Sequence, residues 1–283
     1  MIVGKLDFDP FQNLGGHRCG AGAEVKCSFC HMNLSYQSFV LFQDFFLNIA
    51  FIFPMRHLTA YEFRELADPE LLKTELLNFV TPLSMVGLVI VAHEGINFSV
   101  AGEEAELESF KAEIKDRWGF RNLFFQETPC PLRPFKKFRV KVRKEIVTFG
   151  VAVEKVRAPY IDPEELKNRL DRGENITLVD VRKRMEYERG SFEVAQPLNM
   201  VHFKEFPTLS QKFPEEWKTQ TVVTFCTGGI RCEKAATYLK SQGFQSVYQL
   251  HGGILNYFQK AGGAHWRGDC FVFDDRENLR PDS

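Results

Sequence analysis

Apolar and polar residues follow two spacings over residues 55–150, and together they predict a small mixed domain. Short apolar runs at 57–63, 86–92 and 96–101 are typical of strands, and a further run at 123–125 predicts a fourth. Two stretches between them have apolar residues at helical spacing, one opening at Asp68-Pro69-Glu70 and one after Gly102. The order βαββαβ predicts a ferredoxin-like domain.

Residues 158–276 follow another rhythm, in which buried-type strands alternate with helices. Strands are expected at 176–181, 221–225 and 247–250, and helices at 164–170, 233–241 and 254–260. This alternation predicts an α/β domain with a parallel sheet flanked by helices, whose functional groups lie at the carboxyl ends of strands. We therefore expect domains at 55–150 and 158–276, and a tail at 277–283.

The sequence Cys226-Thr227-Gly228-Gly229-Ile230-Arg231-Cys232 joins the strand expected at 221–225 to the helix that follows. Glycines at such a junction let successive backbone N–H groups converge at a helix N-terminus, which favours a bound anion. This environment lowers the pKa of a thiol, and the thiolate is the nucleophilic form. The alternative is a buried structural cysteine in an ordinary glycine turn.

This loop resembles the active-site loop of rhodanese domains and, more narrowly, that of the tRNA uridine(34) hydroxylase family. The resemblance runs from about Met55 to about Arg276 and rests on an ordered set of motifs: Glu94-Gly95-Ile96-Asn97, Lys144-Glu145-Ile146-Val147-Thr148, Asp180-Val181-Arg182, Leu250-His251-Gly252-Gly253-Ile254, Trp266 and Cys270-Phe271-Val272-Phe273-Asp274. The chain differs from the family at Phe98-Ser99, where relatives tend to carry Gly-Thr. Many relatives also have a cysteine-containing tail beyond the last motif, whereas this sequence stops at Ser283.

The resemblance implies a rhodanese-like catalytic domain at 158–276. It also implies an oxygen-dependent hydroxylation of the wobble uridine (position 34) to 5-hydroxyuridine, with Cys226 as the required cysteine. The partner would be tRNA, bound at its anticodon region, and molecular oxygen would be the co-substrate. The sequence has no iron-binding triad or flavin motif, so no cofactor is expected and the electron source stays open.

The length of the loop limits its chemistry. Cysteine phosphatases usually place five residues between cysteine and arginine, whereas Thr227, Gly228, Gly229 and Ile230 alone separate Cys226 from Arg231. The shorter ring suits one extra sulfur atom better than a phosphate, so Cys226 is expected to be a nucleophile that carries a persulfide. Arg231 either anchors an anionic substrate or locks the loop through a salt bridge. Cys232 either resolves the persulfide as a disulfide or is a small buried residue.

Basic residues alternate with apolar ones just beyond the first domain's βαββαβ unit. In a strand, one face would carry Arg139, Lys141 and Arg143, while Phe138, Val140 and Val142 pack inward. With Lys136 and Lys137, this ridge suits the phosphate backbone of RNA. The alternative is a solvated edge strand whose lysines oppose aggregation.

Two other polar pairs are expected to be structural. His93-Glu94 lies at a hairpin turn, with an acid–base pair as the alternative, and Asp180 is expected to form an ion pair with Arg182.

Residues 1–54 differ from the rest and read as an atypical N-terminal extension upstream of a functional start near Met55. The apolar run 39–53 is shorter than the ~20 residues that span a membrane, so no membrane contact is expected. Cys27-Ser28-Phe29-Cys30-His31 matches a haem-attachment pattern, and zinc binding with Cys19 is the other reading; both are disfavoured, so no metal is expected. Seven cysteines without a disulfide framework fit the reducing cytoplasm.

Three functions compete at this point. The first is the tRNA hydroxylase. The second is a sulfurtransferase that receives sulfane sulfur on Cys226 from a sulfur donor. The third is a non-catalytic tRNA-binding module, which the intact loop disfavours. With 36 basic and 37 acidic residues, net charge does not decide among them.

Overall fold

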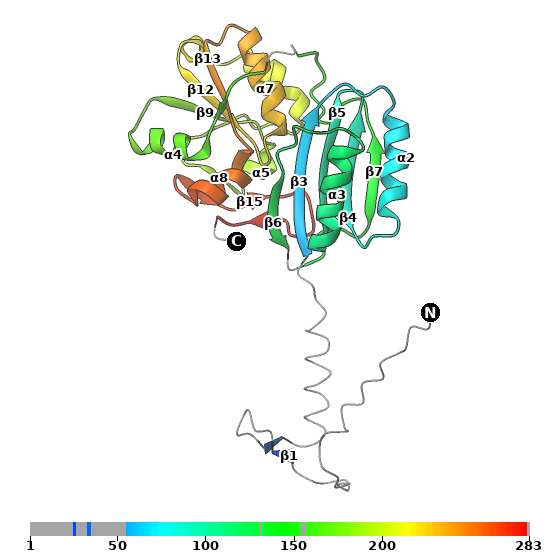
Figure 1. Cartoon of the computed structure of the whole chain (residues 1–283). Coiled ribbons are helices and arrows are strands. Elements are labelled where there is room, and N and C mark those ends of the chain that lie inside the picture. Colours follow the sequence, from blue (N-terminus) through cyan, green and yellow to red (C-terminus); the bar gives the residue numbers. More distant parts are fainter. Residues whose placement is uncertain (1–24, 27–32, 35–54, 131, 154–156, 282–283) are drawn as a thin grey trace. The chain divides into compact units, whose positions relative to one another are not determined.

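The computed structural model describes residues 25–26, 33–34, 55–130, 132–153 and 157–281 (Figure 1). The chain divides into two compact units, Met1–Phe53 and Pro54–Ser283. In the first, β1 (Val25–Lys26) pairs with β2 (Asn33–Leu34) in antiparallel fashion. The predictions made for the Cys27–His31 motif, for Cys19 and for the apolar run 39–53 lie outside the described residues.

The second unit begins with the predicted βαββαβ order. Its elements are β3 (Met55–Phe63), α2 (Pro69–Val80), β4 (Val86–Ala92), β5 (Gly95–Gly102), α3 (Glu104–Asp116) and β6 (Gln126–Cys130). A further strand, β7 (Phe138–Val142), runs parallel to β4, giving the strand order β6-β3-β5-β4-β7. The ferredoxin-like prediction is confirmed.

The strand expected at 123–125 was wrong, because β6 begins at Gln126. Leu123 is buried in the core and Phe124 packs on the ring of His251, with centroids 4.4 Å apart. This apolar run therefore contributes to packing but does not pair with a neighbouring strand. The true strand is polar and contains Pro129. It lies at an edge of the sheet, where a residue without an N–H is tolerated.

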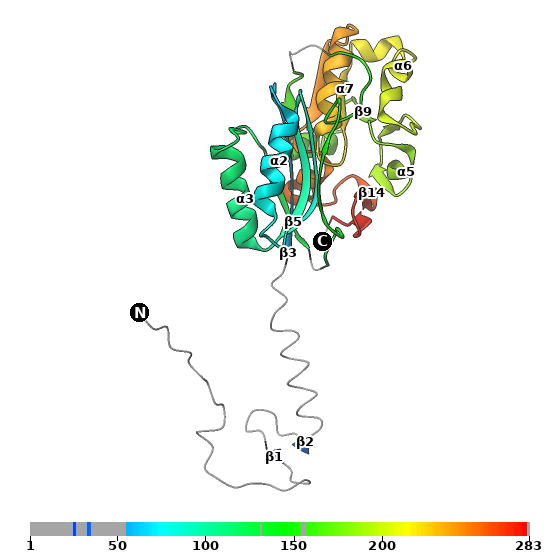
Figure 2. The ribbon, with the colours of Figure 1, turned by 90° about the vertical axis from the view of Figure 1, so that its right-hand side faces the viewer.

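Helices α2 and α3 cover one face of this sheet, and the other face is turned toward α7 (Figure 2). The Asp68 side chain accepts a hydrogen bond from the N–H of Leu71 and caps α2. On β5, Ile96, Phe98 and Val100 belong to the core beneath the helices. Because side chains alternate along a strand, Asn97 and Ser99 belong to the opposite, helix-free face.

The second sheet is all parallel, with the strand order β11-β9-β12-β13-β8, and confirms the α/β prediction. Its strands are β8 (Tyr160–Ile161), β9 (Ile176–Asp180), β11 (Gln196–Pro197), β12 (Thr221–Phe225) and β13 (Ser246–Leu250). The helices are α4 (Pro163–Asp171), α5 (Arg184–Tyr187), α6 (Phe206–Ser210), α7 (Ile230–Ser241) and α8 (Gly253–Ala261), with 3₁₀ turns η1 (Phe203–Glu205) and η2 (Glu215–Lys218).

Apolar side chains fill both faces of this sheet. Val222 packs with α7, and its neighbour Val223 packs with α8, as the alternation of a strand buried on both sides requires. None of the described helices has the length and apolar character needed to cross a membrane.

The C-terminal stretch returns to the first sheet. Two small antiparallel sheets complete this unit: β10 (Gly190–Phe192) pairs with β14 (Trp266–Gly268), and β15 (Cys270–Phe271) pairs with β16 (Asn278–Leu279). Between β15 and β16, the N–H of Asp275 donates to the carbonyl of Pro134, and Arg276 donates to the Thr128 hydroxyl. These contacts fasten the C-terminal segment to the first domain.

Candidate functional site

Cys226 lies directly after β12, where the chain turns into α7. The turn depends on Gly229, which has φ 96° in the left-handed region and forms the N-cap of α7. Its N–H donates to the sulfur of Cys226 over 3.2 Å. The loop therefore directs backbone N–H groups at the sulfur, as predicted from the glycines.

Electrostatics favour the thiolate at Cys226. Burial by itself would raise the pKa of this thiol, but hydrogen bonds and charge outweigh it and lower the pKa to about 6. The contributors are the Cys232 side chain, the positive charge of Arg231 and the backbone N–H groups of Arg231 and Gly229. At neutral pH the sulfur is mainly ionised.

A cavity of about 700 Å³ reaches this loop. The Cys226 side chain has 0% exposed surface, yet the residue forms part of the cavity wall, with Thr227, Gly228 and Ile230. The opposite wall is the helix-free face of the first sheet, represented by Thr59, Leu88 and Asn97. A reactive cysteine thus lies between two domains rather than at an open surface.

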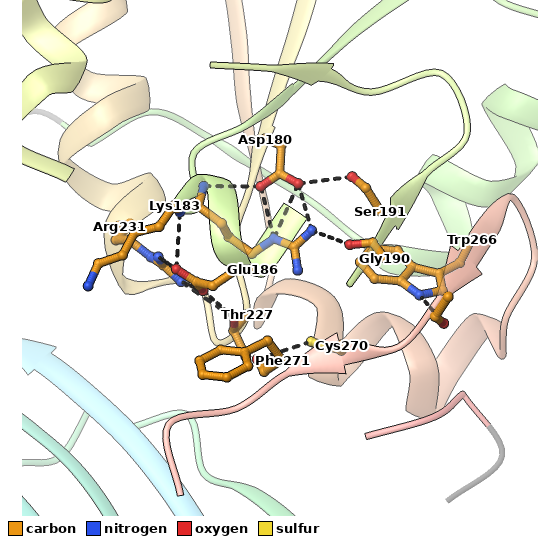
Figure 3. A network of polar contacts seen from close by, with 12 residues as sticks. Asp180, Lys183, Glu186, Gly190, Ser191, Thr227, Arg231, Trp266, Cys270 and Phe271 are labelled. Carbon is orange, nitrogen blue, oxygen red and sulfur yellow. Dashed lines mark hydrogen bonds and ion pairs between the residues drawn. The ribbon is translucent and has the colours of Figure 1, made fainter. Parts of the chain in front are cut away.

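Arg231 forms a buried, two-pronged ion pair with Glu186 of α5. Its Nη1 and Nη2 lie 2.6 and 2.7 Å from the two carboxylate oxygens, and Figure 3 shows the pair beside Thr227. Of the two roles left open by the sequence, this geometry favours locking the loop, while the charge still stabilises the Cys226 thiolate. The pKa of Glu186 is lowered, because Arg231 outweighs the effect of its burial.

Cys232 lies in the first turn of α7 and is fully buried. Burial, and next the neighbouring Cys226, raise the pKa of its thiol well above the ordinary value, so it remains protonated and acts as a donor to Cys226. Neither Cys226 nor Cys232 forms a disulfide in the structure.

The glycine pair Gly252-Gly253 allows α8 to approach the loop closely. A Cβ on Gly253 would lie 2.3 Å from the carbonyl oxygen of Cys226, and its φ is +64°. The N–H groups of Ile254 and Leu255 donate to the carbonyls of Cys226 and Thr227. The first N–H groups of α8 therefore fix the loop through its carbonyls.

Asp180 and Arg182 form the predicted structural pair. Arg182 donates to both carboxylate oxygens and to the carbonyl of Gly190, and Ser191 donates to the same carboxylate (Figure 3). Both charged side chains are buried behind the loop. Cys270 is also buried there, which raises the pKa of its thiol to about 12 and leaves it unreactive.

Two of the basic residues, Arg139 and Lys141, lie on β7 as the alternation predicts, and Arg143 directly follows the strand. In the parallel register, Arg139 pairs with Leu88 and Lys141 with Ile90, and both partners line the cavity. Paired residues share a face, so Arg139 and Lys141 follow the cavity side of the sheet, and Arg143 lines the cavity itself. Lys136 and Lys137 are exposed in the preceding turn. Of the expected inward residues, Phe138 and Val140 contact the core.

Several residues at this site were missed by the sequence reasoning. Glu186 and Tyr61 carry no local signal, and their partners lie 45 and 172 positions away. His57 lines the cavity, and its Nε2 lies 2.7 Å from the Ser99 hydroxyl. Burial, then the charge of Arg276, lower its pKa to about 3 despite Asp274, so its ring is neutral.

Two motifs of the first domain meet at the backbone of one residue, Ile146. The Glu94 carboxylate accepts the N–H of Ile146, and the Asn97 amide donates to the Ile146 carbonyl. Glu94 also pairs with Lys234 of α7 at 2.9 Å, so it ties the two domains together. His93 contacts the Leu66 carbonyl instead of Glu94, so the two residues do not form an acid–base pair. Among the described residues, no group of three His, Cys, Asp or Glu side chains is placed to hold a metal ion.

Comparisons with known proteins cover both domains. Residues 55–146 match the acylphosphatase-like domain of the UPF0176 family, and residues 162–260 match the rhodanese-like domain. A tRNA uridine(34) hydroxylase of Cupriavidus pinatubonensis is 39% identical over 233 residues, covering 80% of this chain and 83% of that protein. One from Legionella pneumophila is 41% identical, covering 76% and 87%. The solved rhodanese-like domain of an Anabaena protein is 29% identical, covering 39% of this chain and 79% of its own, with a TM-score of 0.33.

Proposed function

Since this chain belongs to the tRNA uridine(34) hydroxylase family, we propose that it hydroxylates uridine 34 of tRNA with Cys226 as the reactive side chain. The product is 5-hydroxyuridine and molecular oxygen is the co-substrate, as the family resemblance implies. The observation that carries the proposal is a cysteine with a pKa of about 6 in the wall of a cavity between the two domains.

The loop residues have distinct roles in this proposal. Thr227 to Cys232 form the cradle, in which the Gly229 N–H holds the negative charge on sulfur. Arg231 contributes charge but is committed to Glu186, so it acts on the sulfur rather than on an anionic substrate. The same amides would stabilise a persulfide on Cys226, and in that case a sulfur donor is a further partner.

The RNA partner reaches the cavity along β7. Arg139, Lys141 and Arg143 follow the cavity side of the sheet, and Lys136 and Lys137 extend the basic edge. We infer that this edge, called the basic edge below, holds the phosphates of the anticodon loop while one base enters the cavity. We place this reaction in the cytoplasm, where tRNA is available as the substrate.

Nucleoside analysis tests the reaction. Total tRNA from cells that lack the gene should lose 5-hydroxyuridine and its derivatives, and the wild-type gene should restore them. The Cys226→Ser gene should not, because the hydroxyl of serine is not ionised at neutral pH. Unchanged tRNA together with loss of thiosulfate-to-cyanide sulfur transfer would replace this proposal by the sulfurtransferase.

A further inference from the structure

Asn97 lies on the cavity wall with its amide fixed in one orientation. Its Nδ2 donates to the carbonyl of Ile146 over 3.2 Å. A carbonyl can only accept, so the nitrogen of the amide must face Ile146, and the reverse orientation would set two oxygens against each other. Within the described part of the chain, the Oδ1 oxygen of Asn97 accepts no hydrogen bond. Oδ1 of Asn97 is therefore available as a hydrogen-bond acceptor for a group bound in the cavity.

The strand register places this acceptor beside the cysteine loop. On the neighbouring strand β3, Asn97 pairs with Tyr61. The Tyr61 hydroxyl donates to Glu233 in α7 and lies 3.0 Å from the position of a Cβ on Gly229. The residue next to Asn97 thus touches the cradle, and Asn97 and Cys226 line the same cavity from different domains.

The neighbouring polar groups on this wall are already paired. The Thr59 hydroxyl donates to the carbonyl of Phe98 over 2.8 Å, and the Ser99 hydroxyl is bonded to His57. Apolar Leu88 and Ile90 complete this part of the wall. A flat ring that enters the cavity therefore meets mostly apolar surface, and Asn97 provides a polar contact that can fix its orientation.

We propose that Asn97 reads the N3 edge of the target base and so selects uracil over cytosine; this rests on the proposed function. Uracil carries an N–H donor at N3, which Oδ1 of Asn97 can accept, whereas N3 of cytosine is an acceptor and would face Oδ1 with its lone pair. The C5–C6 edge lies across the ring from N3. A uracil held at N3 by the sheet presents its reacting edge to the wall that carries Cys226.

The test measures binding, which needs no turnover. Anticodon stem–loop RNAs with uridine, cytidine or 3-methyluridine at position 34 are titrated against the full chain. The wild type should bind the uridine RNA about 10- to 100-fold more tightly than the other two, the value of a hydrogen bond whose loss leaves a polar group unpaired. Asn97→Ala should bind all three with similar Kd values.

A matched variant separates recognition from support. Glu94→Ala removes the other side-chain hydrogen bond to the backbone of Ile146 but leaves Oδ1 of Asn97 in place. It should lower thermal stability while keeping the preference for uridine. Loss of the preference in Glu94→Ala to the same degree as in Asn97→Ala would assign Asn97 a purely structural role and overturn the inference.

The wild-type series decides even where a variant does not fold. Equal Kd values for the uridine and cytidine RNAs overturn the inference, and they do so even if the enzyme hydroxylates uridine 34 in tRNA. A uridine preference that Asn97→Ala abolishes supports the inference, and it does so even if no hydroxylated nucleoside forms, in which case the proposed reaction alone fails.

Discussion

The ionisation of Cys226 can be measured directly by the pH dependence of its alkylation. With the pKa lowered from 9.0 to about 6, the thiolate fraction at pH 7 rises from about 1% to about 90%. A thiolate of lower pKa is also a weaker nucleophile, and at a Brønsted slope of about 0.45 three units cost roughly 20-fold in intrinsic rate. The two effects leave a net gain of only a few-fold at pH 7. The midpoint of the profile is therefore the diagnostic quantity, and the absolute rate is not.

Iodoacetamide labelling between about pH 5 and pH 10, followed by mass spectrometry of the Cys226 peptide, gives this midpoint. We expect it near pH 6, with a plateau above neutral pH. Cys232→Ala removes the hydrogen bond that contributes most to lowering this pKa, and should shift the midpoint upward by about one unit or less. Cys270 is the internal control, since burial raises its pKa to about 12. A wild-type midpoint near pH 9 would refute the account of the amide cradle.

Stability should follow the same group. The folded chain loses the Cys226 proton at lower pH than the unfolded chain, whose thiol has the ordinary pKa of 9.0. Unfolding therefore takes up a proton between about pH 6 and pH 9, and this contribution to stability grows with pH over that window and is lost as the pH falls through 6. Denaturant titrations of the wild type and of Cys226→Ser should differ in slope against pH there and nowhere below it.

Three further changes test the site. Glu186→Ala leaves the Arg231 charge buried without its partner and should lower the free energy of unfolding by about 3–5 kcal/mol, measured by urea unfolding; an unchanged midpoint would remove the locking role. Gly253→Ala introduces a Cβ 2.3 Å from the Cys226 carbonyl oxygen at φ +64°, and should destabilise the fold by more than about 1 kcal/mol and slow alkylation of Cys226. The control is Gly243→Ala, whose Cβ has nothing within 4 Å at a φ of +88°, so it measures the cost of backbone strain alone. Alanine at Arg139, Lys141 and Arg143 of the basic edge should weaken stem–loop RNA binding. It should also reduce the slope of log K against log salt concentration by about 2, since each single-strand phosphate contact contributes about 0.7. A triple alanine variant at exposed Arg172, Lys212 and Lys240 should leave both quantities unchanged.

The local parts of this molecule were predictable because local spacing determines them. Strand β4 has the predicted bounds, and α7 follows the cysteine loop as the glycines require. Strand β6 was misplaced, since Gln126 to Cys130 is polar and contains Pro129, a composition that an edge position tolerates but that no strand pattern reveals.

The long-range parts were not predictable from spacing. Glu186 pairs with Arg231 across 45 positions, and no local pattern around either residue indicates its partner. The family motif that contains Asn97 and the one that contains Ile146 are far apart in the sequence, and a pair of hydrogen bonds to the backbone of Ile146 connects them. Such bonds depend on how two loops approach each other, which periodicity does not encode.

Three consecutive residues near the start of α7, Cys232 to Lys234, have a consequence for dissection of the enzyme. Cys232 supports the thiolate, while the next two residues, Glu233 and Lys234, hold Tyr61 and Glu94 of the other domain. A protein truncated to its C-terminal half would keep Cys226 but would lose the wall of the cavity that the first sheet provides. We expect such a fragment to react with small electrophiles without selecting a base, because selection needs both domains.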